Sequence, residues 1–250
     1  MARKTWLALM VCCCLALTAR AESTRTLLVQ DNKYPDSREF EVGVSVDYAE
    51  DTVLNNDVTG VAIAPYCRYG VPGDRLTASV AVPYLLLEGD FIDDDQGPGD
   101  VLLGLDLSAF NDEYGNQEFI TPYLRVSLPT GDEGKGLGTG ETIVIFGTSF
   151  GSTVAEWYTL VLDASYTFQP DEDNLAALAL AVIWDASEIF ALSLECMVTD
   201  EKDAEGDFPY YVTGTMRYKA TDDLSVLWGG GFVENSTQEV VASVRVSYTF

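Results

Sequence analysis

The chain has 250 residues, of which 47% are hydrophobic, and it carries 40 acidic residues against 14 basic ones and no histidine. This excess of negative charge excludes binding to nucleic acid, which requires clustered lysine and arginine side chains. The lack of histidine excludes catalytic triads with an imidazole base and zinc sites built on imidazole. No carboxylate pair stands out as a glycosidase site. We therefore predict a protein that is not an enzyme and holds no cofactor.

The first 21 residues have the parts of a secretory signal peptide. Arg3 and Lys4 form a basic start, an apolar run extends from Trp6 to Leu17, and Ala19-Arg20-Ala21 closes the segment. The apolar run is about 12 residues long, whereas a membrane-spanning helix needs roughly 20. We predict cleavage after Ala21. A lipoprotein anchor is a weaker alternative, because the residues before the cysteines of this segment are not small.

Removal of this segment leaves 11 basic residues against the same 40 acidic ones. We assign residues 22–38 to an N-terminal periplasmic extension and residues 39–250 to one domain. Two cysteines remain in this mature chain, Cys67 and Cys196. We predict that they act as small hydrophobic residues rather than as a disulfide, since a single pair makes no disulfide framework.

The dominant pattern in the mature chain is alternation of apolar and polar residues. At the end of the chain one face carries Val240, Ala242, Val244, Val246, Tyr248 and Phe250, and the other carries Val241, Ser243, Arg245, Ser247 and Thr249. A period of two is typical of a β-strand between an apolar and a polar environment. Apart from the segment 175–184, where alanine and leucine permit either reading, no part of the chain favours a helix. We predict two strands around Asp185 for that segment.

Turn signals divide the domain into about twelve segments, which we predict as strands. Their spans are 39–49, 58–69, 75–85, 100–110, 118–128, 141–150, 156–168, 174–184, 187–198, 208–219, 222–232 and 237–250. Strands of about ten residues or more suit a membrane crossing, whereas strands of soluble domains usually have five or six residues. In lipid a sheet must close so that no edge stays unpaired. We therefore predict an all-β fold, a transmembrane antiparallel β-barrel of about twelve strands. A secreted soluble β-sandwich is the alternative fold.

The predicted connections differ in length between the two ends of the barrel. If the last strand ends in the periplasm, the turns on that side span residues 70–74, 111–116, 151–155, 185–186 and 220–221. The loops at the opposite end span 50–57, 86–99, 129–140, 169–173, 200–207 and 233–236. Short periplasmic turns and longer external loops are typical of outer-membrane barrels. The external loops include the acidic run Asp93-Asp94-Asp95, with Asp90 and Asp100 nearby. We favour a solvated acidic loop there, with divalent cations as candidate partners.

Two sequence motifs carry a resemblance to outer-membrane proteins. The alternating end of the chain, with Tyr248 and the final Phe250, resembles the closing strand by which such proteins are recognised for insertion. Gly99-Asp100-Val101, Leu128-Pro129-Thr130-Gly131-Asp132 and Gly138-Thr139-Gly140 are similar to motifs of the outer-membrane family named for the MetA pathway of phenol degradation. This resemblance implies a β-barrel that transports small aromatic compounds.

The polar faces of the predicted strands indicate what lines the interior. Its charged candidates are Arg68, Asp100, Asp106, Arg125, Asp163, Glu195, Arg217 and Arg245, together with Glu41, Asp47 and Lys219. Charges of both signs can line a narrow aqueous path, or they can pair across a small barrel and fill it. We therefore predict a narrow channel or transporter for small solutes, aromatic ones included. The alternative is a filled structural or adhesive barrel with cation-binding loops.

These expectations imply definite partners and a definite location. The partners are outer-membrane lipid, lipopolysaccharide and the barrel-insertion machinery, and the location is the outer membrane of a Gram-negative cell.

Fractionation of expressing cells tests the barrel directly. We expect the mature protein in the outer-membrane fraction, as a band that changes its mobility on a gel when the sample is boiled, since a closed barrel resists detergent until heated. A protein that stays soluble without detergent and shows no such change would contradict this prediction.

Overall fold

The computed structural model describes residues 35–53, 56–73, 75–89, 92–111, 118–155, 157–170, 174–200, 208–234 and 238–250. The predicted signal peptide and most of the predicted periplasmic extension lie outside these residues. The described residues contain one helical turn, the 3-10 turn η1 (Glu133–Lys135), and are otherwise mostly β-strand. Among them there is no helix long and apolar enough to cross a membrane.

Fifteen strands of the described residues make up the sheet. They are β1 (Phe40–Val53), β2 (Asn56–Val71), β3 (Leu76–Ala81), β4 (Tyr84–Gly89), β5 (Ile92–Pro98), β6 (Val101–Leu107), β7 (Phe110–Asn111), β8 (Phe119–Leu128), β9 (Ile143–Ala155), β10 (Tyr158–Phe168), β11 (Leu175–Ser187), β12 (Phe190–Thr199), β13 (Tyr210–Lys219), β14 (Leu224–Glu234) and β15 (Gln238–Thr249).

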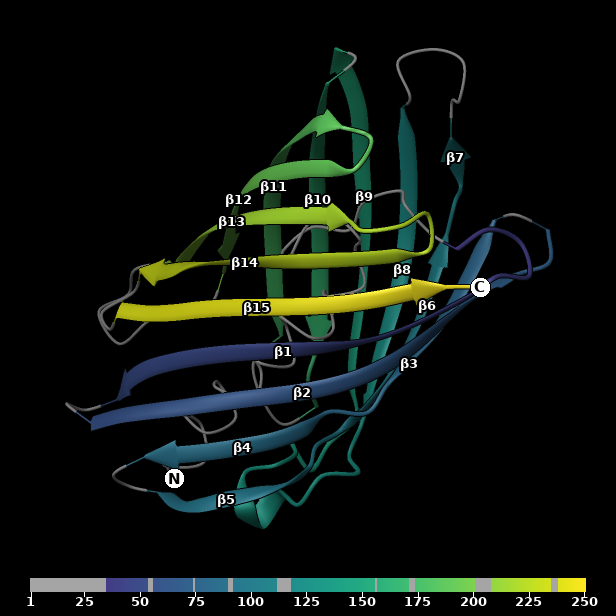
Figure 1. The fold of residues 1–250 in the computed structure, drawn as a ribbon. Helices are drawn as coiled ribbons and strands as arrows, with labels where there is room; N and C mark the ends of the chain where they lie inside the picture. The colour runs from purple at the N-terminus through teal and green to yellow at the C-terminus, as the bar shows by residue number, and fades with distance from the viewer. Residues whose placement is uncertain are drawn as a thin grey trace.

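The sheet is antiparallel and closes on itself. Strand β1 pairs with β2 along one edge and with β15 along the other, and Figure 1 shows β1 lying between them. Strands β3 and β4 share one position in the ring, because both pair with β2, and β5, β6 and β7 share the next. The fifteen strands therefore occupy twelve positions, which confirms the predicted barrel. The alternative prediction of a soluble β-sandwich is wrong, because the described strands form one closed sheet and not two packed sheets.

The largest departure from the predicted strands lies around Pro83. We predicted an external loop over residues 86–99, but β4 and β5 pair there as a hairpin that prolongs the wall. Proline has no N–H for the ladder, so the strand breaks at Pro83 and resumes as β4. The carbonyl of Pro83 still accepts the N–H of Gly99 at 2.8 Å. This bond joins the break between β3 and β4 to the break between β5 and β6. The break thus interrupts the predicted strand without ending the sheet.

Two predicted periplasmic turns are also displaced. Strand β9 continues through the glycine-containing segment 151–155, where Thr153 pairs with Thr159 of β10 and their hydroxyls lie 3.2 Å apart. Strand β11 continues to Ser187 through a bulge after Asp185. In both places pairing with the neighbouring strand overrides the local turn signal, because each further ladder bond satisfies backbone groups.

The two faces of the sheet differ as the alternation predicts. In β10 the outer face exposes Tyr158, Leu160 and Leu162, whereas the alternate residues Thr159, Val161 and Asp163 are buried on the inner face. Exposed apolar side chains cover the outside of most other strands in the same way. Both mature cysteines are free, and Cys196 is exposed on the outer face. Such an outer surface suits contact with lipid.

Aromatic rings join the first and last strands where the barrel closes. Phe40 and Phe250 exchange two backbone hydrogen bonds of 2.9 and 2.8 Å. The ring of Phe40 stacks on Tyr69 with centroids 4.5 Å apart, and Phe250 lies within 6.2 Å of Phe40 and 5.9 Å of Tyr248. We call this end of the barrel the Phe250 end and the opposite one, which carries η1, the η1 end. The last residue of the chain thus contributes to closure of the sheet.

Replacement of Phe250 tests this closure. We expect Phe250→Ala to lower the free energy of unfolding by about 1–3 kcal/mol, because two aromatic contacts of about 0.5–1.5 kcal/mol each are lost. The barrel should then lose its compact gel mobility at a lower temperature. Val154→Ala, an apolar change on the outer face of β9 away from the closure, is the matched control. Equal unfolding temperatures for both variants would contradict the prediction.

Candidate functional site

Charged side chains of both signs pair on the inner face of the barrel. In the first group, on β1 and β2, Nη1 of Arg68 donates to both carboxylate oxygens of Glu41 at 3.3 and 3.2 Å. The hydroxyl of Tyr66 donates to Oε1 of Glu41 at 3.1 Å. Arg68 is fully buried and Glu41 nearly so. The strand register brings this pair together, since Glu41 and Arg68 stand directly opposite each other.

Strand β15 adds an arginine beside this group. Arg245 is buried and stands opposite Ser45 of β1. The hydroxyl of Ser45 donates to Asp47 at 2.9 Å, and Asp47 is buried two residues further along the same face. The closing seam of the barrel therefore carries charges of both signs on its inner side.

A second group spans β6, β8, β9 and β10. Nη2 of Arg125 lies 2.6 Å from Oδ1 of Asp106, and the guanidinium lies 5.1 Å from the centre of the Tyr123 ring. The hydroxyl of Tyr123 donates to Oδ1 of Asp163 at 2.9 Å, and Ser149 donates to the other oxygen of that carboxylate. Four buried polar side chains from four strands thus engage one another around Tyr123.

A third group lies on β11, β12 and β13. Ser193 bonds both to Glu195, at 2.8 Å, and to the hydroxyl of Thr215. Nearer the Phe250 end, Nη2 of Arg217 lies 3.8 Å from Asp185. Charged groups therefore occur around the whole inner wall and not on one side of it.

Asp100 has a different environment from the other predicted interior residues. It is fully buried, and its carboxylate accepts the N–H of Gly131 at 2.8 Å and both the N–H and the hydroxyl of Thr139 at 2.9 Å. Leu137 of the same loop packs within the buried apolar cluster, next to Gly97 of β5. Asp100 thus anchors the loop 129–142 against the wall where β5 has no strand partner among the described residues on its second edge.

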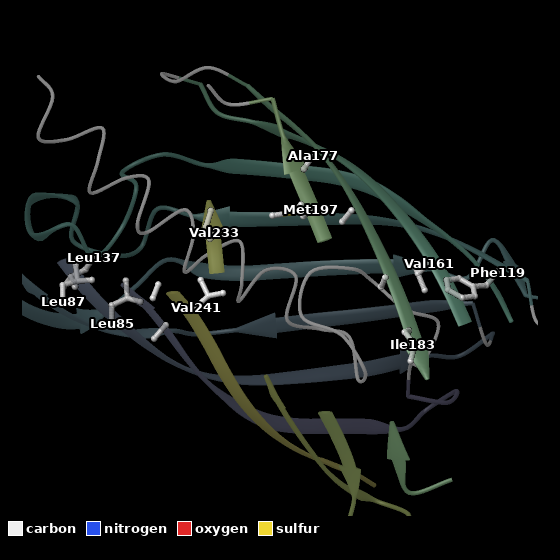
Figure 2. Packing of buried hydrophobic residues seen from close by; sticks show 14 residues of the cluster. Leu85, Leu87, Phe119, Leu137, Val161, Ala177, Ile183, Met197, Val233 and Val241 are labelled. Carbon is white, nitrogen blue, oxygen red and sulfur yellow. The ribbon is translucent and has the colours of Figure 1, made fainter. Parts of the chain in front are cut away.

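Apolar side chains occupy both ends of the inner face. Figure 2 shows Leu85, Leu87 and Leu137 gathered at one end of the cluster and Phe119 with Ile183 at the other. The first three lie toward the η1 end, on β4 and on the loop that Asp100 holds. The group around Tyr123 lies between these two apolar regions along the strands, whereas Glu41 with Arg68 and Asp185 with Arg217 lie at the Phe250 end.

The described residues contain no group of three or more acidic or cysteine side chains that could hold a metal ion. Of the acidic external loops, residues 171–173 and 201–207 and the side chains of residues 91–94 lie outside the described part. Asp95 is described, and Lys135 of η1 approaches it to 4.0 Å. The cation-binding loops stay a prediction.

Sequence reasoning missed the tyrosines of the inner face. Tyr66 and Tyr123, which were not among the predicted interior residues, stand on the polar face beside the charged pairs. Their positions along β2 and β8 predict the inner face, because residues two apart on a strand point to the same side of the sheet. Tyr66 is two residues from Arg68, and Tyr123 is two residues from Arg125. Position along the strand was therefore the usable signal.

Solved structures of a similar fold include an outer membrane channel, a translocator domain and a porin. The crystal structure of an outer membrane channel from Pseudomonas putida F1 has a TM-score of 0.73 and 17% identity, over 89% of this chain and 100% of that one. The fold is that of an outer-membrane β-barrel. The translocator domain of the autotransporter NalP from Neisseria meningitidis matches with a TM-score of 0.62 and 11% identity, over 98% of this chain and 97% of its own. The NanC porin matches with a TM-score of 0.58 and 10% identity, over 83% of this chain and 98% of its own.

No family model and no curated protein sequence matches the chain. The resemblance to the phenol-degradation family, drawn from motifs around Asp100 and Thr139, therefore stays a prediction. The structure gives those motifs a physical role, since Gly131 and Thr139 supply the donors that bind Asp100.

Replacement of Asp100 tests its role as an anchor. We expect Asp100→Ala to lower the free energy of unfolding by at least about 3 kcal/mol, because three hydrogen bonds to a charged group are lost and each contributes about 1.5–3 kcal/mol. The loosened loop should also be cut faster by trypsin after the exposed Lys135. Glu88→Ala, which removes an exposed carboxylate from neighbouring β4, is the control. Cleavage at the wild-type rate in Asp100→Ala would contradict the prediction.

Proposed function

We propose that this chain is an outer-membrane channel that passes small solutes through the barrel without covalent chemistry. The observation that carries this proposal is the contrast between the two faces of one closed sheet. The outer face is apolar and exposed, as contact with lipid requires, while the inner face carries Arg68, Arg125 and Arg245 with their acidic neighbours. Rings of charge on an inner wall select which solutes pass.

The distribution of apolar side chains supports a finer proposal about the solute. At the η1 end the inner face carries Leu85 and Leu87 and contacts Leu137. A solute with an apolar body, an aromatic compound included, would meet these leucines before it reached the charged groups. The likeness in fold to an outer membrane channel and to a porin supports transport through the barrel.

The same proposal assigns roles to the predicted interior residues. The charged layer of the inner wall around the path consists of Arg68, Asp106, Arg125, Asp163, Glu195, Arg217 and Arg245, and Asp100 shapes the mouth of the path through the loop. The barrel reaches the outer membrane through its signal peptide and the insertion machinery, which reads the closing strand with Tyr248 and Phe250. Lipid and lipopolysaccharide then surround the outer face.

Single-channel recording in planar bilayers tests the proposal. We expect the wild-type protein to conduct, and Arg125→Ala to make the channel more selective for cations, because Asp106 keeps its negative charge without its partner. The readout is the reversal potential in a salt gradient. Leu124→Ala, an exposed outer-face change on the same strand, is the control.

Each other outcome has a definite meaning. A folded wild-type barrel that shows no conductance would overturn the channel in favour of a filled structural barrel. A conducting protein whose selectivity is the same with and without Arg125 would remove this arginine from the path.

A further inference from the structure

Three aromatic side chains of the inner face each stand directly opposite a glycine of the next strand. The pairs are Tyr66 with Gly43, Tyr123 with Gly147, and Phe119 with Gly151. Two strand interfaces, β1 with β2 and β8 with β9, therefore share one arrangement.

In every pair the ring occupies the space that a side chain on the glycine would need. A Cβ added to Gly43 would lie 2.5 Å from Cζ and Oη of Tyr66, and a Cβ on Gly147 would come closer still to the same atoms of Tyr123. At Gly151 the three nearest atoms all belong to the ring of Phe119. Real Cβ atoms do not approach so closely, so each ring lies along the wall over the glycine backbone. None of the three stands up into the barrel.

The hydroxyl groups hold two of the rings in this position. Tyr66 donates to Glu41 at 3.1 Å and Tyr123 donates to Asp163 at 2.9 Å. Glu41 is itself held by Arg68. The hydrogen bonds and the glycines thus act together, because one fixes the tip of the ring and the other makes room for its face.

We infer that these three glycines set the free bore of the channel and thereby the size of solute that it admits. The inference rests on the proposed function. The number and tilt of the strands fix the circumference of a closed barrel, so the free cross-section depends on how far the inner side chains project. A ring that lies against the wall leaves the path open, and the same ring displaced by a methyl group narrows it. Gly43, Gly147 and Gly151 are therefore determinants of specificity, although none of them carries a side chain.

Alanine at Gly151 gives the cleanest test, since the three atoms nearest to the added methyl group all belong to the ring of Phe119. At Gly43 the added methyl group would also lie 2.6 Å from the carbonyl oxygen of Val246, so the backbone itself would have to move. We expect Gly151→Ala to lower single-channel conductance at least about two-fold relative to wild type, because conduction follows the narrowest part of the pore. Liposome swelling with neutral sugars of increasing size should show a smaller size limit.

Removal of the ring separates the effect of the bore from a general loss of structure. Adding Phe119→Ala to Gly151→Ala should restore wild-type conductance, because no ring is left to be displaced. Phe119→Ala alone should change conductance little, since its ring already lies against the wall. Gly214→Ala is the control, as the nearest atom to its added methyl group is the carbonyl oxygen of Ser193 at 3.8 Å, on the outer side of the sheet.

The outcomes distinguish this inference from the proposed function. A wild-type barrel without conductance overturns both. A conducting wild type with equal conductance in Gly151→Ala overturns the inference alone. If Gly151→Ala does not give a heat-modifiable barrel, Phe119→Ala decides, because an increase in conductance of about two-fold or more would place its ring in the path and overturn the inference.

Discussion

Backbone hydrogen bonding is the constraint on which the rest of this structure depends. A sheet in lipid leaves no group unpaired only if its first and last strands meet, and here β1 and β15 pair over ten successive residue pairs. Closure fixes which face points inward, and it brings the start and the end of the described chain together at Phe40 and Phe250. Every feature of the interior follows from this ring, because only a closed sheet has an inside.

The wall tolerates defects where another group satisfies the backbone. Pro83 interrupts one strand, and β4 and β5 continue beyond it as a hairpin. The loop 129–142 lies where strand pairing ends, and it is held by a buried carboxylate and an inserted leucine instead of a ladder. Asp100 therefore accepts backbone N–H groups in this part of the wall, as the carbonyl groups of a neighbouring strand do elsewhere. A loop with so many internal bonds is part of the barrel and not an appendage to it.

The interior combines charge pairing with close packing against the wall. Arg68 with Glu41, and Arg125 with Asp106, place opposite charges on adjacent strands, so that neither member of a pair faces the interior alone. The carboxylates also fix tyrosine rings against glycines. One set of contacts therefore provides both the electrostatic character of the wall and the width of the space inside it, which links solute selection by charge to selection by size.

The sequence by itself determined the barrel and the face on which each residue lies, because alternation is a local property of an extended chain. The alternation of residues along β8, for example, predicts from the sequence alone that Arg125 lies on the inner face. Only the tertiary structure decided which inner residues meet. Tyr123 and Asp163 are 40 residues apart in the chain, and Arg68 and Glu41 are 27 apart. Their contacts depend on the register between strands, and in a closed sheet the pairings of all neighbouring strands together set that register. The same holds for Tyr66 over Gly43, since neither residue reveals its partner until the strands are aligned.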